Sequence, residues 1–375
     1  MITRLVRGGA QENTLHTVRL ANRRRYVAEL LAGPPEGPEG SLEDQAEEQG
    51  VPVQRIAHLV RAPAPRRDVL AYRDLLMRFR RERYDIVHTH TSKAGILGRA
   101  DAARAGVPHL VHTPHGNVFH GYFNPVLTGA FVRAERWAAG FTDRIIELTP
   151  GGIDEHLAQG IGARDQFRVV FSGIDLAPYE DARAARAATR AALGLPGDAF
   201  VVGGVGRLEP VKGFIHLVDA ARHLLETGAD LYFVQAGVGS QAPLLKEAAR
   251  PLGPRFHWLG HRDDVPNLMA AFDVLVVPSE NEGMGRVVLE AGAAGVACVA
   301  ARTGGLPDVI DEGRTGLLVP PREPSAIAAA LRRLLDDRAY CQALGAAARE
   351  KVVPHYGLTR MVRAIEELYE ELLDG

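Results

Sequence analysis

The sequence predicts an α/β protein made of two doubly wound domains, each with a parallel sheet between two layers of helices. Short apolar runs alternate with helical patterns along the chain, and such strand–helix–strand repeats give parallel sheets covered on both faces. The alternation is interrupted once and then restarts. A length of 375 residues is enough for two domains of ordinary size.

The runs expected to form strands are short, apolar and rich in β-branched residues. In the first half they are "ITRLV", "YVAELLAG", "VPVQRIAH", "DIVHTHT", "HLVHTPHG", "DRIIELTP" and "FRVVFSG". In the second half they are "AFVVGGVG", "LYFVQAG", "FHWLGH", "DVLVVPS", "ACVAA" and "GLLVPP". Segments with apolar residues three to four apart, such as "KGFIHLVDAARHLLETG", indicate helices between them. The first strand is short, so either it is clipped or the chain begins downstream of its natural start.

The interruption lies in "FSGIDLAPYEDARAARAATRAALGLPGD", which indicates a connection followed by a lead-in helix. We therefore predict an N-terminal domain at residues 1–172 and a C-terminal domain at residues 173–356. The amphipathic segment 357–375 is predicted to be a helix that packs across the domain junction. Two doubly wound domains joined in this way leave a cleft at the carboxyl ends of their strands, where ligands bind.

The composition is that of a globular protein, with 46% hydrophobic and 24% charged residues. No apolar run reaches the ~18 residues of a spanning helix, and no signal segment opens the chain. Cys298 and Cys341 lie far apart in the sequence without metal-site spacing, so no disulfide framework is expected. Free cysteines are typical of a reducing compartment, and a cytoplasmic location is therefore expected.

The net charge of −2 makes nucleic acid an unexpected partner. Residues 1–170 nevertheless carry more basic than acidic side chains, and the excess is concentrated in "ANRRRY" and "MRFRRERY". Two interpretations are open. These arginines are solvated helix ends, or they form a surface that rests on anionic lipid at the inner face of the membrane.

The segment "VVGGVGRLEPVKG" places cations where an anionic ligand is expected. A buried strand ends in glycines, which allow a ligand close to the backbone, and Arg207 and Lys212 follow before a helix begins. Two cations beside a helix N-terminus suit a diphosphate. The alternatives are a plain turn and a dinucleotide fingerprint, but the fingerprint is not satisfied because Glu209 stands where it needs a glycine.

The segment "PSENEGMGRVVLEAG" combines two carboxylates with helix-end amides. A helix starts near Gly285, so the amides of Gly283, Met284 and Gly285 lie at its N-terminus and can bind anionic or hydroxyl oxygens. Glu282 in the turn can accept bonds from sugar hydroxyls, and Glu290, on a later turn of the helix, can reach a ribose diol. The alternative is coincidence, since pairs of glutamates at this spacing abound.

The polar residues of the first half form less specific patterns. A metal site is one interpretation of the histidines His88, His90, His112, His115 and His120. No Asp or Glu cluster with fitting spacing completes such a site, so packed or hydrogen-bonded histidines and no metal are expected. Lys93 begins a helix after a strand, and either meets an acidic acceptor or phosphate or has a surface role.

Together these segments resemble the family-4 glycosyltransferases of GT-B fold over nearly the whole chain. The similarity to the family's C-terminal, donor-binding domain lies in "GRLEPVKG", "WLGHRDDVPNLMAAFDVLVVPS", "ENEGMGRVVLEA" and "ARTGGLPDVI". Glu282 and Glu290 match the family's Glu-x7-Glu motif. The similarity to its N-terminal, acceptor-side domain lies in "RLVRGGAQENTL" and "HTHTSKAGILGR…HTPHG".

The resemblance implies roles for the candidate residues of the C-terminal domain. Arg207 and Lys212 bind the donor diphosphate and stabilise it as it leaves. Glu282 and the amides of residues 283–285 hold the donor sugar, and Glu290 holds the ribose.

The resemblance also implies roles for residues elsewhere in the chain. The loop at His261 and Arg262 lies near the base. The turn at Gly8 and Gly9 approaches the donor phosphates from the N-terminal domain, and His115 sits beside the transferred sugar. The residues implied in catalysis are thus Arg207, Lys212, Glu282 and His115.

The family retains the anomeric configuration, usually without a metal, so neither a metal nor another cofactor is expected. In this chemistry the bond to the diphosphate loosens and the acceptor oxygen enters on the same face of the sugar. Catalysis is then mainly electrostatic stabilisation and positioning. Met284 stands where an aromatic residue is common in the family, so a shifted sugar pocket is expected.

We therefore expect a retaining hexosyltransferase that moves a sugar from a nucleotide-diphosphate sugar to a hydroxyl of a saccharide or lipid-linked acceptor, in cell-surface polysaccharide or glycolipid synthesis. A UDP-sugar is the first expectation for the donor and GDP-mannose the second. Two alternatives remain: a non-hydrolysing nucleotide-sugar epimerase of the same architecture, and a non-catalytic protein that binds UDP-sugars.

Overall fold

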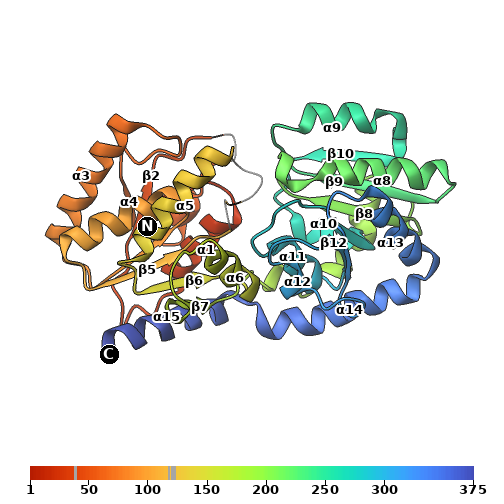
Figure 1. Ribbon diagram of the computed structural model, residues 1–375. Helices are drawn as coiled ribbons and strands as arrows, with labels where there is room; N and C mark the ends of the chain where they lie inside the picture. The colour runs from red at the N-terminus through yellow and green to blue at the C-terminus, as the bar shows by residue number, and fades with distance from the viewer. Residues whose placement is uncertain (38–39, 117–118, 120–123) are drawn as a thin grey trace. The chain divides into compact units, whose positions relative to one another are not determined.

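The computed structural model of the chain describes residues 1–37, 40–116, 119 and 124–375, which form two compact units (Figure 1). The first unit contains Met1–Gly173 and Leu358–Gly375, and the second contains Ile174–Gly357. The break after Gly173 lies one residue beyond the predicted domain boundary, which was placed between residues 172 and 173. Each unit is built around its own sheet and core.

The first unit has a parallel seven-stranded sheet in the order β3-β2-β1-β4-β5-β6-β7. Its strands are β1 (Ile2–Arg4), β2 (Leu30–Gly33), β3 (Val53–Arg55), β4 (Ile86–His90), β5 (His109–Thr113), β6 (Arg144–Glu147) and β7 (Phe167–Val169). The strand order reverses between β1 and β4. In doubly wound sheets, ligands bind beyond the carboxyl ends of the strands at such a reversal.

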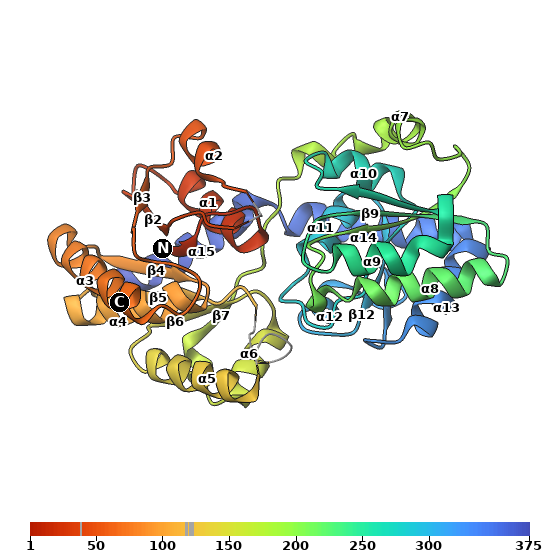
Figure 2. The ribbon, with the colours of Figure 1, turned by 90° about the horizontal axis from the view of Figure 1, so that it is seen from above.

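Helices cover both faces of this first sheet (Figures 1 and 2). They are α1 (Gly9–Leu20), α2 (Glu43–Glu48), α3 (Pro65–Glu82), α4 (Ser92–Ala105), α5 (Pro125–Ala139), α6 (Pro150–Ala158) and α15 (Leu358–Asp374). Alternate residues of a strand point to opposite faces, so Leu110 of β5 packs with α3 and α4 while Val111 packs with α15. The last helix therefore lies on the first sheet, and its packing across the domain junction stays a prediction.

The second unit has a parallel six-stranded sheet in the order β10-β9-β8-β11-β12-β13, the same winding as in the first unit. Its strands are β8 (Phe200–Val205), β9 (Leu231–Ala236), β10 (Phe256–Gly260), β11 (Val274–Val277), β12 (Ala297–Ala301) and β13 (Leu317–Val319). Here the order reverses between β8 and β11. The predicted fold class of two doubly wound domains is confirmed, and every run predicted to be a strand forms one.

The helices of the second unit also cover both faces of its sheet. They are α7 (Arg186–Ala192), α8 (Phe214–Glu226), α9 (Ala242–Ala249), α10 (Val265–Ala271), α11 (Arg286–Ala293), α12 (Leu306–Val309), α13 (Pro324–Asp336) and α14 (Arg338–His355). Phe200 and Val202 of β8 pack in one cluster with Leu217 of α8. Among all described helices, none combines the length and the hydropathy that crossing a membrane requires.

Candidate functional site

The candidate site of the second unit lies at the carboxyl ends of β8 and β11, the two strands at which the sheet order reverses. β8 ends at Val205 and leads to Arg207, whereas β11 ends at Val277 and leads to Glu282. Because parallel strands end at one edge of the sheet, these two distant segments of the chain meet there. The structure thus brings together the two segments that the sequence singled out.

Lys212 and Glu282 form the contact that joins these segments. Nζ of Lys212 lies 2.5 Å from Oε2 of Glu282, and the two side chains are only 21% and 14% exposed. The hydroxyl of Ser279 donates to the same oxygen over 3.0 Å. The backbone is joined as well, because the amide of Glu280 donates to the carbonyl of Val211 over 2.8 Å. The sequence predicted a separate ligand group for each side chain, and in the structure the ammonium and the carboxylate bind each other.

The turn that carries Glu282 is held by backbone contacts that need glycine. The amide of Gly305 donates to the carbonyl of Glu282 over 3.0 Å. A Cβ on Gly304 would lie 1.8 Å from that carbonyl oxygen, so no other residue fits at this position without movement of the backbone. The "ARTGGLP" segment therefore fixes the position of the Glu282 backbone.

The residues after Glu282 lead directly into α11. Gly285 is the N-cap of this helix with φ 73°, a left-handed conformation that favours glycine. Gly283 to Gly285 therefore precede the first turn of the helix, as predicted. Met284 is only 2% exposed, so its side chain packs inside the protein. Glu290 lies half-buried on α11, and its role toward a ribose stays a prediction.

Arg207 and Arg262 follow β8 and β10 at the same edge of the sheet. Arg207 is exposed. Arg262 donates to both carboxylate oxygens of Asp264 over 2.7 and 2.6 Å, and the pKa of its guanidinium is raised chiefly by this hydrogen bonding. The arginine is therefore oriented by its own loop, and its contact with a base stays a prediction.

Glu280 is a residue of this edge that the sequence analysis missed. Its carboxylate oxygens lie 3.2 Å from Nε2 of His216 and 2.5 Å from a guanidinium nitrogen of Arg322. Although burial raises the pKa of Glu280, the hydrogen bonds from Arg322 and His216 outweigh it and lower the pKa overall. Its position inside the segment "PSENEG" could have identified Glu280 as a candidate. Its partners His216 and Arg322 come from distant segments, so residue spacing cannot predict these contacts.

The corresponding edge of the first unit follows β1, β4 and β5. Gly8 is the N-cap of α1 and Gly9 is the first residue of that helix, so the predicted glycine turn lies just beyond β1. His90 ends β4, and His115 follows β5. The residues predicted for the first domain therefore lie at the carboxyl ends of neighbouring strands.

His115 is held in place by a series of aromatic rings. Its φ of 63° is unusual for a residue other than glycine, and its Nε2 lies 2.8 Å from Nδ1 of His90. The ring of His88 lies 4.1 Å from that of His90, and Nδ1 of His88 lies 2.6 Å from the hydroxyl of Tyr369 on α15. Burial lowers the pKa of His88 and His90 well below the ordinary value, so both are neutral at pH 7. His90 and Tyr369 were missed as partners of this edge, although the H-x-H pattern was noticed.

Within the part of the chain that the structure describes, no three His, Cys, Asp or Glu side chains are grouped to hold a metal ion. His120 lies outside that part. Lys93, for which a phosphate or a surface role was considered, lies 2.5 Å from a carboxylate oxygen of Asp68 and donates to the carbonyl of Ala62. Its ammonium therefore contacts two acceptors inside the first unit, and its role toward an acidic acceptor or a phosphate stays a prediction.

Two family models match the chain. Residues 8–173 match the glycosyl transferase 4-like domain, and residues 185–351 match the glycosyl transferases group 1. The chain is 31% identical to the UDP-Gal:alpha-D-GlcNAc-diphosphoundecaprenol alpha-1,3-galactosyltransferase of Escherichia coli, over 82% of this chain and 80% of that protein. It is 34% identical to a D-inositol 3-phosphate glycosyltransferase of Streptomyces bingchenggensis, over 78% of this chain and 68% of that protein.

Solved structures share the fold at lower identity. HepE of Anabaena in complex with UDP-glucose is 24% identical, with a TM-score of 0.83 over 99% of this chain and 98% of that chain. WaaG, a glycosyltransferase involved in lipopolysaccharide biosynthesis, is 18% identical, with a TM-score of 0.75 over 96% of each chain.

Proposed function

Since the chain belongs to the family-4 glycosyltransferases of GT-B fold, we propose that it is a retaining enzyme that moves a hexose from a UDP-sugar to a hydroxyl of a saccharide or lipid-linked acceptor. Transfer of a sugar from a nucleotide sugar follows from the family itself. The UDP donor, the retained configuration, the acceptor class and a role in cell-surface polysaccharide or glycolipid synthesis are the proposal. The expected cytoplasmic location is part of it.

The observation that carries the proposal is the Lys212–Glu282 pair at the reversal of the second sheet, with Arg207 on the same edge. A leaving diphosphate needs cations and amides around its charge. An ammonium has three donors, so Lys212 can bind a phosphate oxygen while Glu282 accepts a hydroxyl of the donor sugar. The group for the diphosphate and the group for the sugar therefore lie next to each other before the donor binds.

The proposed reaction needs no second carboxylate. The bond from the sugar C1 to the diphosphate oxygen breaks, a bond from C1 to the acceptor oxygen forms on the same face, and the acceptor proton passes to the departing diphosphate. Arg207 and Lys212 stabilise the charge that develops on that diphosphate. Because these two cations take that role, we propose that the transfer is independent of metal.

A UDP donor is supported by the relatives. The Escherichia coli relative is named for UDP-Gal, and HepE is described in complexes with UDP and with UDP-glucose. GDP-mannose is the second candidate.

The test is an assay of UDP and GDP release from a panel of donor sugars, with and without acceptor extracts. We expect release of UDP that depends on acceptor, a product whose anomeric configuration by NMR equals that of the donor, and a rate unchanged by EDTA. An epimerase would convert the sugar without releasing a nucleotide diphosphate. A binding protein would retain UDP with no turnover. Either outcome would contradict the proposal.

We also propose that α3 rests on anionic lipid during transfer to a membrane-bound acceptor. One exposed face of this helix carries Arg66, Val69, Arg73, Met77 and Arg80 at intervals of three to four residues. Val69 and Met77 are each 60% exposed, and arginines beside exposed apolar side chains suit an anionic membrane surface. Solvated helix ends explain the arginines but not the apolar residues between them.

The membrane proposal is tested by co-sedimentation with phosphatidylglycerol and phosphatidylcholine vesicles. We expect binding to the anionic vesicles alone, and its loss in the double variant Arg73→Glu, Arg80→Glu. Arg104→Glu, at the exposed end of α4, is the matched control. Equal binding by both variants would locate the lipid contact elsewhere.

A further inference from the structure

The second unit has a pocket at the edge of its sheet opposite to the candidate donor site. The pocket has a volume of about 170 Å³ and adjoins Phe200, which begins β8, and Asp273, which precedes β11. These are the amino ends of the two strands whose carboxyl ends lead to Arg207 and Glu282. A water molecule occupies about 30 Å³ in the liquid, so the pocket has room for a multi-atom ligand.

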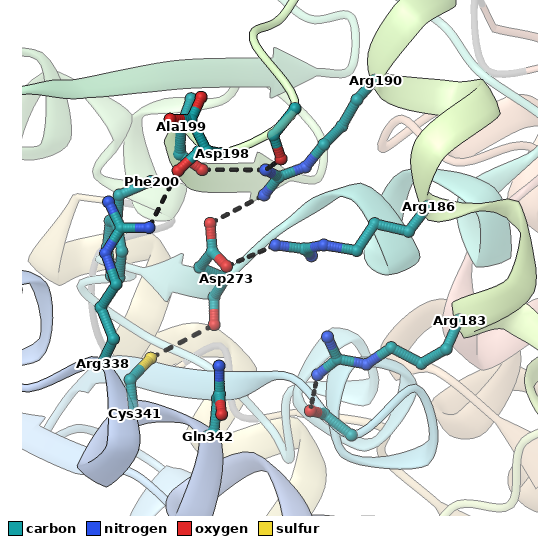
Figure 3. Close-up of a pocket in the computed structure, with 12 residues that line it drawn as sticks. Arg183, Arg186, Arg190, Asp198, Ala199, Phe200, Asp273, Arg338, Cys341 and Gln342 are labelled. Carbon is teal, nitrogen blue, oxygen red and sulfur yellow. Dashed lines mark hydrogen bonds and ion pairs between the residues drawn. The ribbon is translucent and has the colours of Figure 1, made fainter.

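The lining of this pocket carries an excess of positive charge (Figure 3). Its basic residues are Arg183, Arg186, Arg190 and Arg338, and its acidic residues are Asp198 and Asp273. Figure 3 shows the three arginines of the 183–190 segment on one side and the α14 residues on the other. Four guanidinium groups against two carboxylates leave a net charge of +2 on the lining.

Two of these arginines serve as a structural brace. Arg186 and Arg190 lie 2.5 and 2.8 Å from the two carboxylate oxygens of Asp273. They also donate to carbonyls at the end of α10, Arg186 to Ala270 and Arg190 to Ala271, each over 2.9 Å. The charge of Asp273 is thus already compensated, and burial lowers the pKa of Arg190 even so.

The other two arginines make fewer contacts with the described residues. Arg183 donates to the carbonyl of Gly295 over 2.5 Å, and Arg338 donates to the carbonyl of Asp198 over 2.9 Å. A guanidinium has five N–H donors, so one such bond leaves most of its donors for a ligand. Gln342 lines the same pocket one helical turn after Arg338 and adds an amide donor.

We propose that this pocket binds a phosphate-type oxyanion, either free phosphate or the phosphoryl group of a metabolite, through Arg183, Arg338 and Gln342. The planar guanidinium matches phosphate oxygens in pairs, and a lining of +2 complements a dianion. The brace accounts for Arg186 and Arg190, whereas Arg183 and Arg338 each make one hydrogen bond and Arg338 also lies over the ring of Phe200, which leaves their remaining donors for a ligand. Because the pocket is at the opposite edge from the donor site, its ligand does not compete with the donor.

The test is isothermal titration of the full chain with inorganic phosphate and with glycerol 3-phosphate, in a phosphate-free buffer at constant ionic strength. The variants are Arg183→Gln, Arg338→Gln and Gln342→Leu, which all leave the brace on Asp273 intact. The control is Arg250→Gln, because the Arg250 side chain is 76% exposed and lies outside the pocket. Lys212→Ala separates this binding from binding of phosphate at the donor site.

We expect one phosphate per chain in the wild type, in Arg250→Gln and in Lys212→Ala. Each arginine substitution in the pocket should weaken binding about tenfold or more, because a charge-assisted hydrogen bond is lost. Tighter binding of glycerol 3-phosphate identifies a phosphomonoester as the ligand, and the reverse order identifies free phosphate. Unchanged binding in the pocket variants, loss in Lys212→Ala alone, or no binding by the wild type at millimolar phosphate would overturn the proposal. None of these results depends on the identity of the sugar donor.

Discussion

The two units wind their sheets in the same order but place opposite kinds of chemistry at the carboxyl edge. The first unit gathers the rings of His88, His90 and His115, of which His90 is buried, His88 is half-buried and both are neutral. The second unit gathers charges, with Lys212 bound to Glu282. The winding of the sheet therefore decides where a site lies, whereas the side chains decide what it binds.

The largest expected effect is at the charged edge of the second unit. Lys212→Ala removes a cation from the leaving diphosphate, so we expect kcat to fall by about 10²–10³ with little change in the melting temperature. Lys246→Ala, an exposed lysine on α9, is the control. Steady-state kinetics measure both. Full activity in Lys212→Ala and in Glu282→Ala would show that the charged edge is not the donor site.

The neutral edge of the first unit should make the protein sensitive to acid. The pKa of His88 and His90 is lowered by burial, whereas in the unfolded chain it returns to about 6.5. Below that pH the unfolded state binds protons that the folded state does not, so stability falls as the pH drops from about 7 to 5. The melting temperature should fall less steeply with decreasing pH across this range in the double variant His88→Gln, His90→Asn. The exposed His223→Asn should keep the slope of the wild type.

A smaller effect is expected from the contact that orients His115. His90→Leu removes the nitrogen that lies 2.8 Å from Nε2 of His115, so we expect kcat to fall about tenfold with KM for the donor little changed. His90→Asn keeps a polar atom close to the place of Nδ1 and should recover part of the rate. Equal rates in the two variants would mean that the contact only supports packing.

The smallest effect concerns Asp101 on α4, the helix that connects β4 to β5 in the first unit. Burial raises the pKa of Asp101 to about 8, and neither carboxylate oxygen has a hydrogen-bond partner among the described residues. The folded state therefore holds a proton that the unfolded state has lost above about pH 4, so stability falls as pH rises toward 8. Asp101→Asn removes this penalty, and we expect a melting temperature roughly 2–4 °C higher at pH 8 and little gain at pH 4. A lower melting temperature at pH 8 would show that the carboxylate is satisfied.

The sequence predicted the secondary structure well because the signals are local. The run "DVLVVPS" is apolar on both faces, as is typical of a strand buried in a parallel sheet, and its residues Val274–Val277 form the expected strand. The glycines around Met284 likewise mark the turn into α11 because their conformational freedom is local. The segments that contain the candidate site residues could therefore be identified before the structure was known.

The strands, the helices, the break into two domains and the turns that carry polar residues could all be predicted from the amino-acid sequence, since hydrophobic periodicity and turn chemistry act over a few neighbouring residues. Long-range contacts had to be seen in the folded chain: Lys212 binds Glu282, Glu280 contacts both His216 and Arg322, and four arginines line one pocket. Such partners lie far apart along the chain and meet only where the winding of the sheet brings strand ends together, so no spacing in the sequence encodes them.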